Sequence, residues 1–438
     1  MSRNQVRIII VGAGIAGLSA AQRLYKEGFQ DVTILEGSNR TGGRICTTDF
    51  GRYDTSAGLV ELGANWIHGT GEDNSVYCLA NDNNLLKPYV LLDRDGRRIP
   101  KSLTDKAWKI FQQLENNADR FYTGSSSTEE TITSFDYLIK SMRSGLQKFP
   151  KSVREDAWAI YREGMSNCQA ASPGVVGTIL KDLPVHWIRL NHKVETIRWQ
   201  SHPGSKVTVH CSNNSKERTF VADHVILTSS LGYLKKHHKR LFSPNLPQYK
   251  MSSIEKMGFG KVNKILLHFK NPFWDKGTGS VKFAWSGHDF EFNPDTWYKS
   301  LFAFDEVLNN DSVLLGWIHG RAAEYVETLS DDEVKQTCAW LLRKFLNRPS
   351  IPVPDSILRS SWCSNQYSVG SYSYVAVGST DRDLRNLSQP LYHDGKPLVL
   401  FSGEATHPKY YSTTHGARSS GLREAERLCN FYSAKSKL

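Results

Sequence analysis

The sequence predicts an α/β protein with a discontinuous nucleotide-binding domain, and three observations support that prediction. A strand, a glycine turn, a helix and a second strand follow one another between residues 6 and 36. A buried strand at residues 398–401 and a helix at residues 416–431 add segments of the same kind far along the chain. The 438 residues are too many for one ordinary core, so a second, α+β domain is expected to be inserted into the first.

The first strand and turn predict a site for a dinucleotide. Residues 6–11 are mostly apolar and β-branched, which is typical of a buried strand. Gly12 permits the tight turn, Gly14 lets a pyrophosphate approach the backbone, and Gly17 lets the helix over residues 18–26 pack closely on the strand. This Rossmann-like spacing by itself does not decide whether the dinucleotide is NAD or FAD.

The segment after this helix favours FAD. A second strand, residues 32–35, leads to Glu36, which is placed to accept hydrogen bonds from an adenosine ribose. Gly42, Gly43 and Arg44 follow. This segment resembles the GGR segment of flavin amine oxidases and glutathione-reductase-like FAD proteins, in which the arginine and backbone amides hold the FAD pyrophosphate. The resemblance implies the same role for Arg44, and an arginine fork suits it because it pairs with a phosphate at two points.

The middle of the chain contains ordinary structural signals. Residues 207–211 alternate as a half-buried strand does, and residues 225–228 read as a buried strand. Residues 330–333 (SDDE) form a capping box that should open a helix. The basic run at residues 235–240 is interpreted as a solvated loop.

Composition excludes several classes of protein. The net charge of +11 is compatible with nucleic-acid binding. However, no nucleic-acid motif or interleaved aromatic platform is present, so no nucleic-acid partner is expected. No apolar run approaches the length of a membrane span, so no membrane association is expected. The seven scattered cysteines indicate reduced thiols in an intracellular compartment and no metal site.

Ser436, Lys437 and Leu438 form a peroxisomal address. They predict a peroxisomal location, reached through the import receptor that reads this tripeptide; otherwise the cytoplasm is expected.

Longer motifs identify a family. Residues 61–69 (ELGANWIHG), 370–374 (GSYSY), 401–407 (FSGEATH) and 410–416 (YYSTTHG) resemble the flavin-containing amine oxidases, specifically the polyamine oxidase branch. The resemblance covers nearly the whole chain. It implies the amine oxidase fold, in which a substrate domain is inserted into the FAD-binding domain. The expected bounds are 1–95, 185–262 and 380–438 for the FAD-binding domain, and 96–184 and 263–379 for the substrate domain.

The resemblance also implies a set of cofactor contacts. Nothing matches the cysteine that tethers FAD in monoamine oxidases, so the FAD is expected to be non-covalent. The expected contacts are Gly12, Gly14, Gly17, Glu36, Gly42, Gly43, Arg44 and Val194 for the ADP half, Glu404 near the ribityl chain, and Trp362, Thr413 and Thr414 near the flavin.

Lys264 matches the lysine that holds a water at the reactive flavin nitrogen in this family, with Lys261 as a nearby competitor. His68 matches a pocket histidine that orders or accepts the substrate ammonium proton. These two are the expected catalytic residues, and His68 is also expected to contact substrate. The other expected substrate contacts are the aromatic residues Trp66, Tyr372 and Tyr411 and the anionic residue Glu163.

The implied activity is oxidation of a secondary amine of acetylspermine or acetylspermidine by hydride transfer to FAD. Dioxygen becomes hydrogen peroxide, and the imine hydrolyses to an aldehyde and a shorter polyamine. A monomer is expected. Oxidation of free spermine remains an alternative.

One departure leaves another alternative open. The chain is shorter than its relatives between Tyr161 and Leu183, within the substrate domain. A shortened substrate domain is therefore expected, and with it the possibility of an FAD-binding variant with impaired catalysis.

Overall fold

The computed structural model forms two compact units, and each is described by itself. The first unit comprises Met1–Asn65, Glu72–Leu85 and Ala171–Leu438, and the second Trp66–Gly71 and Leu86–Ala170. The described residues are 3–51, 58–68, 74–85, 168–170 (backbone only), 174–199, 206–213, 216–275, 279–283, 292–307, 310–435 and isolated positions between 102 and 150.

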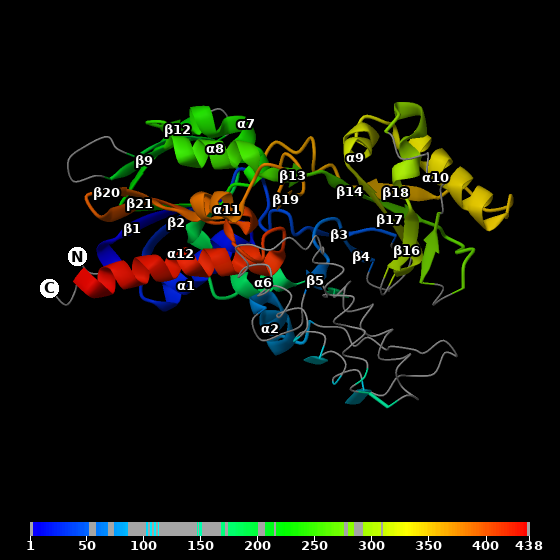
Figure 1. Cartoon of the computed structure of the whole chain (residues 1–438), viewed down its shortest axis with the longest axis horizontal. Helices are drawn as coiled ribbons and strands as arrows, with labels where there is room; N and C mark the ends of the chain where they lie inside the picture. The colour runs from blue at the N-terminus through cyan, green and yellow to red at the C-terminus, as the bar shows by residue number, and fades with distance from the viewer. Residues whose placement is uncertain are drawn as a thin grey trace. The chain divides into compact units, whose positions relative to one another are not determined.

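The first unit contains a six-stranded sheet in the order β20-β21-β11-β1-β2-β7, of which β1, β2, β20 and β21 are labelled in Figure 1. Its strands are β1 (Arg7–Val11), β2 (Asp31–Leu35), β7 (Ile188–Arg189), β11 (His224–Leu227), β20 (Leu391–His393) and β21 (Lys396–Phe401). All pair in parallel except β20. Strands β2 and β7 follow β1 on one side of it, whereas the later strands β11 and β21 lie on the other side of β1. The strand order therefore reverses between β1 and β11, where open α/β sheets bind their ligands.

Two helices from opposite ends of the chain pack side by side (Figure 1). They are α1 (Ile15–Lys26) and α12 (Thr414–Lys435). A Cβ on Gly421 would lie 2.1 Å from the Ala16 carbonyl oxygen, so only glycine allows this approach. Farther along, Arg23 pairs with Glu426 at 2.9 Å. Because segments from both ends of the chain share this sheet and this helix pair, the expected discontinuous α/β fold is confirmed.

A four-stranded sheet packs beside the first, in the order β10-β9-β8-β12, with two further helices. These elements are β8 (Lys193–Arg198), β9 (Val207–Asn213), β10 (Lys216–Ala222), β12 (Phe242–Ser243), α7 (Leu231–Leu241) and α8 (Gln248–Lys256).

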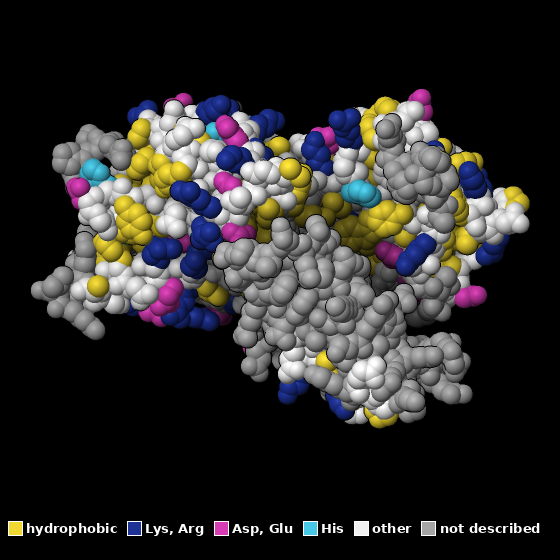
Figure 2. Space-filling model, viewed as in Figure 1, with side chains coloured by type: hydrophobic (Ala, Val, Ile, Leu, Met, Phe, Trp, Pro, Cys, Tyr) yellow, Lys and Arg dark blue, Asp and Glu magenta, His cyan; other side chains and the backbone are white. Residues whose placement is uncertain are grey.

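The interpretation of residues 235–240 as a loop is wrong, because they lie within α7. Leu234, His238 and Leu241 recur at helical spacing and are buried, so the basic side chains occupy the outer face. Figure 2 shows acidic side chains scattered among the basic ones on the face in view.

A five-stranded antiparallel sheet has the order β15-β16-β17-β14-β18. Its strands are β14 (Val262–His268), β15 (Ser280–Lys282), β16 (Ala303–Val307), β17 (Asn310–His319) and β18 (Ser356–Arg359). Helices α9 (Arg321–Val326) and α10 (Asp331–Leu346) cover one face. The predicted capping box is confirmed, since Ser330 and Glu333 bond reciprocally at the start of α10.

Shorter elements complete the described chain. In the first unit they are η1 (Arg3–Gln5), β3 (Thr47–Asp49), β4 (Leu59–Glu61), α2 (Ser75–Asp82), α6 (Val175–Leu180), η4 (Val185–Trp187), β13 (Gly258–Gly260), η5 (Pro294–Ser300), β19 (Tyr372–Tyr374), α11 (Asp381–Ser388) and η6 (Glu404–Thr406); in the second, β5 (Trp66–His68) pairs with β6 (Cys168–Ala170). No helix in the described ranges is long and apolar enough to cross a membrane.

Lys250 in α8 is a fully buried lysine. Its Nζ donates to the carbonyl oxygens of Asn386 at 2.6 Å and Leu387 at 3.0 Å, at the end of α11. It also lies 4.0 Å from the centre of the Phe401 ring. Burial lowers the pKa of Lys250 to about 7, and the charge of Glu424 offsets part of that effect. Lys250 therefore caps a helix end at the cost of a buried charge.

Replacing Lys250 with methionine should change how stability depends on pH. Between pH 7 and 10 the unfolded chain binds a proton at this lysine that the folded chain does not. The wild-type unfolding free energy should therefore rise with pH by up to about 1.4 kcal/mol per unit from this group. Lys250→Met should lose that rise and be less stable throughout, because two carbonyl groups lose their donor. Melting temperatures from pH 6 to 9.5 test this, and parallel curves for the two proteins would contradict it.

Candidate active site

The glycine turn after β1 forms a cradle at the switch point of the sheet. Gly12 has φ +105°, and a Cβ there would lie 2.4 Å from Oγ1 of Thr228, which follows β11. A Cβ on Gly17 would lie 2.1 Å from the Gly12 carbonyl oxygen, so the turn and α1 are in close contact. In contrast, a Cβ on Gly14 would meet nothing within 4 Å. Open space at the start of α1, next to unpaired helix N–H groups, fits a pyrophosphate.

The second glycine pair lies against this cradle. The Gly42 N–H donates to the Ala13 carbonyl at 2.8 Å, and a Cβ on Gly43 would lie 3.3 Å from Gly14 Cα. Both glycines have positive φ, +99° and +59°. Arg40, which the sequence interpretation missed, holds the loop by donating to three of its carbonyl groups.

Glu36 lies at the end of β2 and is 7% exposed. Its carboxylate accepts from the Ala13 N–H at 2.7 Å and from the N–H and hydroxyl of Ser38 at 2.8 and 2.7 Å. It thus ties the end of its strand to the glycine turn. Val194 is buried in β8, where the ladder with β9 shifts register, and its carbonyl accepts from the Tyr233 hydroxyl at 3.5 Å.

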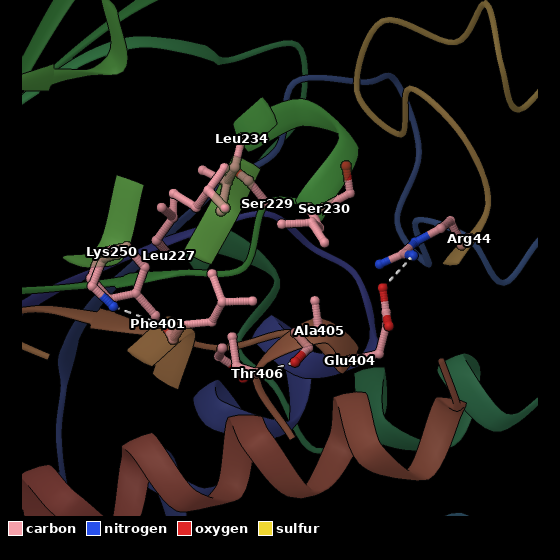
Figure 3. A pocket seen from close by; sticks show the side chains of 15 residues that line it. Arg44, Leu227, Ser229, Ser230, Leu234, Lys250, Phe401, Glu404, Ala405 and Thr406 are labelled. Atoms are coloured by element: carbon pink, nitrogen blue, oxygen red, sulfur yellow. Dashed lines mark hydrogen bonds and ion pairs between the residues drawn. The ribbon is translucent and has the colours of Figure 1, made fainter. Parts of the chain in front are cut away.

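Glu404 connects three segments of the chain, and Figure 3 shows its ion pair with Arg44. It is 4% exposed, and its carboxylate accepts from Arg44 Nη1 at 2.9 Å, the Ser373 hydroxyl at 2.5 Å and the Ser412 N–H at 2.8 Å. Arg44 Nη1 also donates to the Ser371 carbonyl at 2.7 Å. The carboxylate thereby holds the second glycine loop, β19 and the turn before α12 together.

A narrow pocket opens beside this ion pair (Figure 3). Arg44 and Glu404 line one end of it, and Lys250 and Phe401 line the other. Leucines such as Leu227 lie between them.

The start of α12 is fixed by local hydrogen bonds. The Thr413 hydroxyl accepts from the Gly416 N–H at 3.0 Å and donates to the Tyr410 carbonyl at 2.7 Å, which makes Thr413 the cap residue. Thr414 is the first helical residue. The positive end of the helix dipole is therefore at Thr413 and Thr414.

Lys264 is buried at 2% exposure in β14. Its Nζ donates to the carbonyl oxygens of Glu61 at 2.7 Å and Gly63 at 2.6 Å, and to Asn65 Oδ1 at 3.1 Å. It also lies 4.6 Å from the centre of the Trp317 ring. Burial lowers the pKa of Lys264 to about 7. The fold thus holds a lysine that gains and loses a proton near neutral pH.

Trp362 contacts the same segment as Lys264. Its Nε1 donates to the Leu62 carbonyl at 3.1 Å, and its backbone N–H donates to Asn263 Oδ1 at 3.0 Å. The sequence interpretation missed Asn263, which is 1% exposed and also accepts from Ser360 at 2.9 Å. The available signal was a polar residue directly beside Lys264 in an otherwise apolar strand.

Lys261, the competitor of Lys264, pairs with Glu324 near the surface. Tyr372 is 41% exposed in β19, where it pairs with Gly260, and Tyr411 packs partly buried against the core of the first unit. Neither tyrosine is brought to Lys264 by any described hydrogen bond.

The remaining expected substrate residues lie in the second unit or outside the described residues. Trp66 and His68 belong to the second unit, in β5. Partial desolvation lowers the pKa of His68, which favours its neutral form. Glu163 and the tripeptide 436–438 lie outside the described residues.

Six cysteines in the described chain are free thiols, at positions 46, 78, 211, 338, 363 and 429. Burial raises the pKa of Cys363, next to Trp362, to about 12, so this thiol is not a nucleophile at neutral pH. Within the described ranges, no three His, Cys, Asp or Glu side chains gather as metal ligands would.

Several known proteins are similar to this chain over nearly its whole length. The model of the family "flavin containing amine oxidoreductase" matches residues 15–163 and 109–429. The peroxisomal N(1)-acetyl-spermine/spermidine oxidases of Bos taurus and Homo sapiens are 33% and 32% identical, over 97% of this chain and 95% of each relative. Probable polyamine oxidase 5 of Arabidopsis thaliana is 30% identical, over 98% of this chain and 99% of its own length.

The alignment with the bovine protein extends over 501 positions, whereas this chain has 438 residues. The chain therefore lacks segments that this relative has.

Proposed function

Because this chain belongs to the flavin-containing amine oxidoreductases, we propose that it oxidises a secondary amine of acetylspermine or acetylspermidine. Dioxygen is the electron acceptor, and the products are hydrogen peroxide, an aldehyde and a shorter polyamine. The observation that carries the proposal is Lys264, a buried lysine with a pKa lowered to about 7 that donates to the carbonyl of Gly63, next to the Leu62 carbonyl that Trp362 holds. The names of two relatives supply the substrate class.

The cofactor proposed is non-covalent FAD, and the cradle at Gly14 supports it. The empty space there suits a pyrophosphate, and Arg44 still has N–H groups to offer after its bonds to Glu404 and Ser371. When bound, the flavin accepts two electrons from the amine and passes them to dioxygen. The contacts proposed are Gly12, Gly14, Gly17, Glu36, Gly42, Gly43, Arg44, Val194, Trp362, Glu404, Thr413 and Thr414.

The Nζ atom of Lys264 is proposed to hold a proton or pass it on during the reaction. All three of its partners accept hydrogen bonds, which an ammonium satisfies completely with its three N–H groups. The neutral amine has only two N–H groups, so the longest bond, to Asn65, is the first to be lost. The lone pair then faces Asn65, whose amide can turn and donate to it. Both protonation states are therefore accommodated.

The substrate contacts proposed are Trp66, Tyr372 and Tyr411 as aromatic walls and Glu163 as an anchor for a distal ammonium. His68, whose neutral form is favoured, accepts or orders the proton of the reacting ammonium. The enzyme is proposed to act as a monomer. Its FAD-binding domain is proposed to comprise residues 1–95, 185–262 and 380–438, and its substrate domain residues 96–184 and 263–379. Its proposed location is the peroxisome, through the tripeptide 436–438 and its import receptor.

Anaerobic titration of the purified protein with amines tests the function. The protein should be yellow, and N1-acetylspermine should bleach the flavin faster than spermine or spermidine does. Faster bleaching by free spermine would replace the substrate with the alternative one. A colourless folded protein would overturn the flavin enzyme altogether.

An FAD-binding variant with impaired catalysis is the second candidate, and the shortness of the chain favours it. The same titration separates the two. A yellow protein that no amine bleaches, but that dithionite reduces, would establish the impaired variant.

A further inference from the structure

Glu61 is a half-buried acid whose backbone carbonyl contacts the candidate catalytic lysine, and the proposed function leaves its carboxylate without a role. Oε1 accepts from the Thr47 hydroxyl at 2.6 Å, across the β3–β4 pair. Oε2 is buried and has no hydrogen-bond partner among the residues that the structure describes. A buried carboxylate with an unsatisfied oxygen costs free energy unless a nearby charge compensates it.

Lys264 is that charge. Its Nζ donates to the Glu61 backbone carbonyl at 2.7 Å, so the amine of Lys264 contacts the residue that carries the carboxylate. Among the described residues, the titratable groups that act on Lys264 are Glu61 from β4 and Cys46 from the loop before β3. Asn65 and Trp317, its other neighbours, are neutral.

We propose that Glu61 is a positioning residue for Lys264. Its backbone carbonyl orients the amine, and its carboxylate sets whether that amine carries a proton. The proposal rests on the proposed function, because Lys264 is the group through which Glu61 acts. The pKa shifts agree with it: the Glu61 charge raises the pKa of Lys264 against the larger effect of burial, and burial raises the pKa of Glu61.

The pH profile of flavin reoxidation by dioxygen tests the pair. In the wild type, the rate of reoxidation should change with pH around pH 7 as Lys264 loses its proton, and this pH-dependent limb of the profile should be absent in Lys264→Met. Glu61→Gln removes the negative charge that favours the ammonium, so the limb should move to lower pH by about one unit or more. Glu61→Asp keeps the charge and should keep the wild-type limb. Glu324→Gln, which removes the partner of Lys261, is the matched control and should shift nothing.

A uniform loss of rate in Glu61→Gln with an unmoved limb would mean a purely structural role and overturn the proposal. If Glu61→Gln does not fold, Thr47→Val replaces it. The Thr47 hydrogen bond lowers the pKa of Glu61, so its loss favours the neutral acid and should also move the limb to lower pH.

The flavin-free protein gives an independent test. The stability difference between wild type and Lys264→Met should begin to rise with pH near 7. In the Glu61→Gln background the same difference should begin to rise at lower pH. Identical pH profiles in the two backgrounds would overturn the proposal that Glu61 controls the protonation of Lys264. This result does not depend on whether any amine is a substrate, so failure of this proposal and failure of the proposed function are distinguishable.

Discussion

Replacing Gly14 with alanine is expected to leave the protein folded and to weaken FAD binding by about tenfold to a hundredfold. In the flavin-free protein the added Cβ meets nothing within 4 Å, and Gly14 has an ordinary negative φ of −75°. The space it fills is the space proposed for the pyrophosphate. Quenching of flavin fluorescence on titration measures the affinity, and circular dichroism measures the fold.

Two other glycines make this experiment specific. Gly177→Ala in α6 also meets nothing within 4 Å, is far from the cradle in sequence, and should bind FAD like the wild type. Gly17→Ala should fail to fold, because its Cβ would lie 2.1 Å from the Gly12 carbonyl oxygen. Wild-type affinity in Gly14→Ala would show that no phosphate approaches this backbone.

Replacing Lys264 with methionine should slow flavin reoxidation by about 10²- to 10⁴-fold, the usual contribution of a positioned proton-transfer group. Methionine fills a similar volume but carries no proton. Stopped-flow mixing of the reduced protein with dioxygen measures the rate directly, without depending on which amine is the substrate.

Lys261→Met is the matched control for Lys264→Met. Lys261 lies just before β14 and pairs with Glu324 near the surface, so its loss should leave the rate within about twofold of wild type. Comparable losses in the two variants would remove Lys264 from the catalytic residues. A wild-type rate in Lys264→Met would do the same.

Local patterns predicted the elements near Gly12 well because each signal acts within a few residues. A glycine turn needs positive φ where it stands, and a capping box joins residues three apart, so β1, α1 and the start of α10 were predictable. The basic run in α7 was misread because charge alone does not distinguish a loop from the outer face of a helix. Its buried face, with Leu234 and His238, was the better signal.

The sequence by itself determined the glycine cradle, the acid at the end of β2 and the family. These depend on residue type at fixed short spacing, and on long motifs that few sequences share. Tertiary structure alone decided what surrounds Lys264. Residues some 200 positions away provide its three hydrogen-bond acceptors and bury it, and burial brings its pKa to about 7. Desolvation and hydrogen bonding depend on neighbours in space, which is why the place of Glu61 beside Lys264 emerged only once the chain was folded.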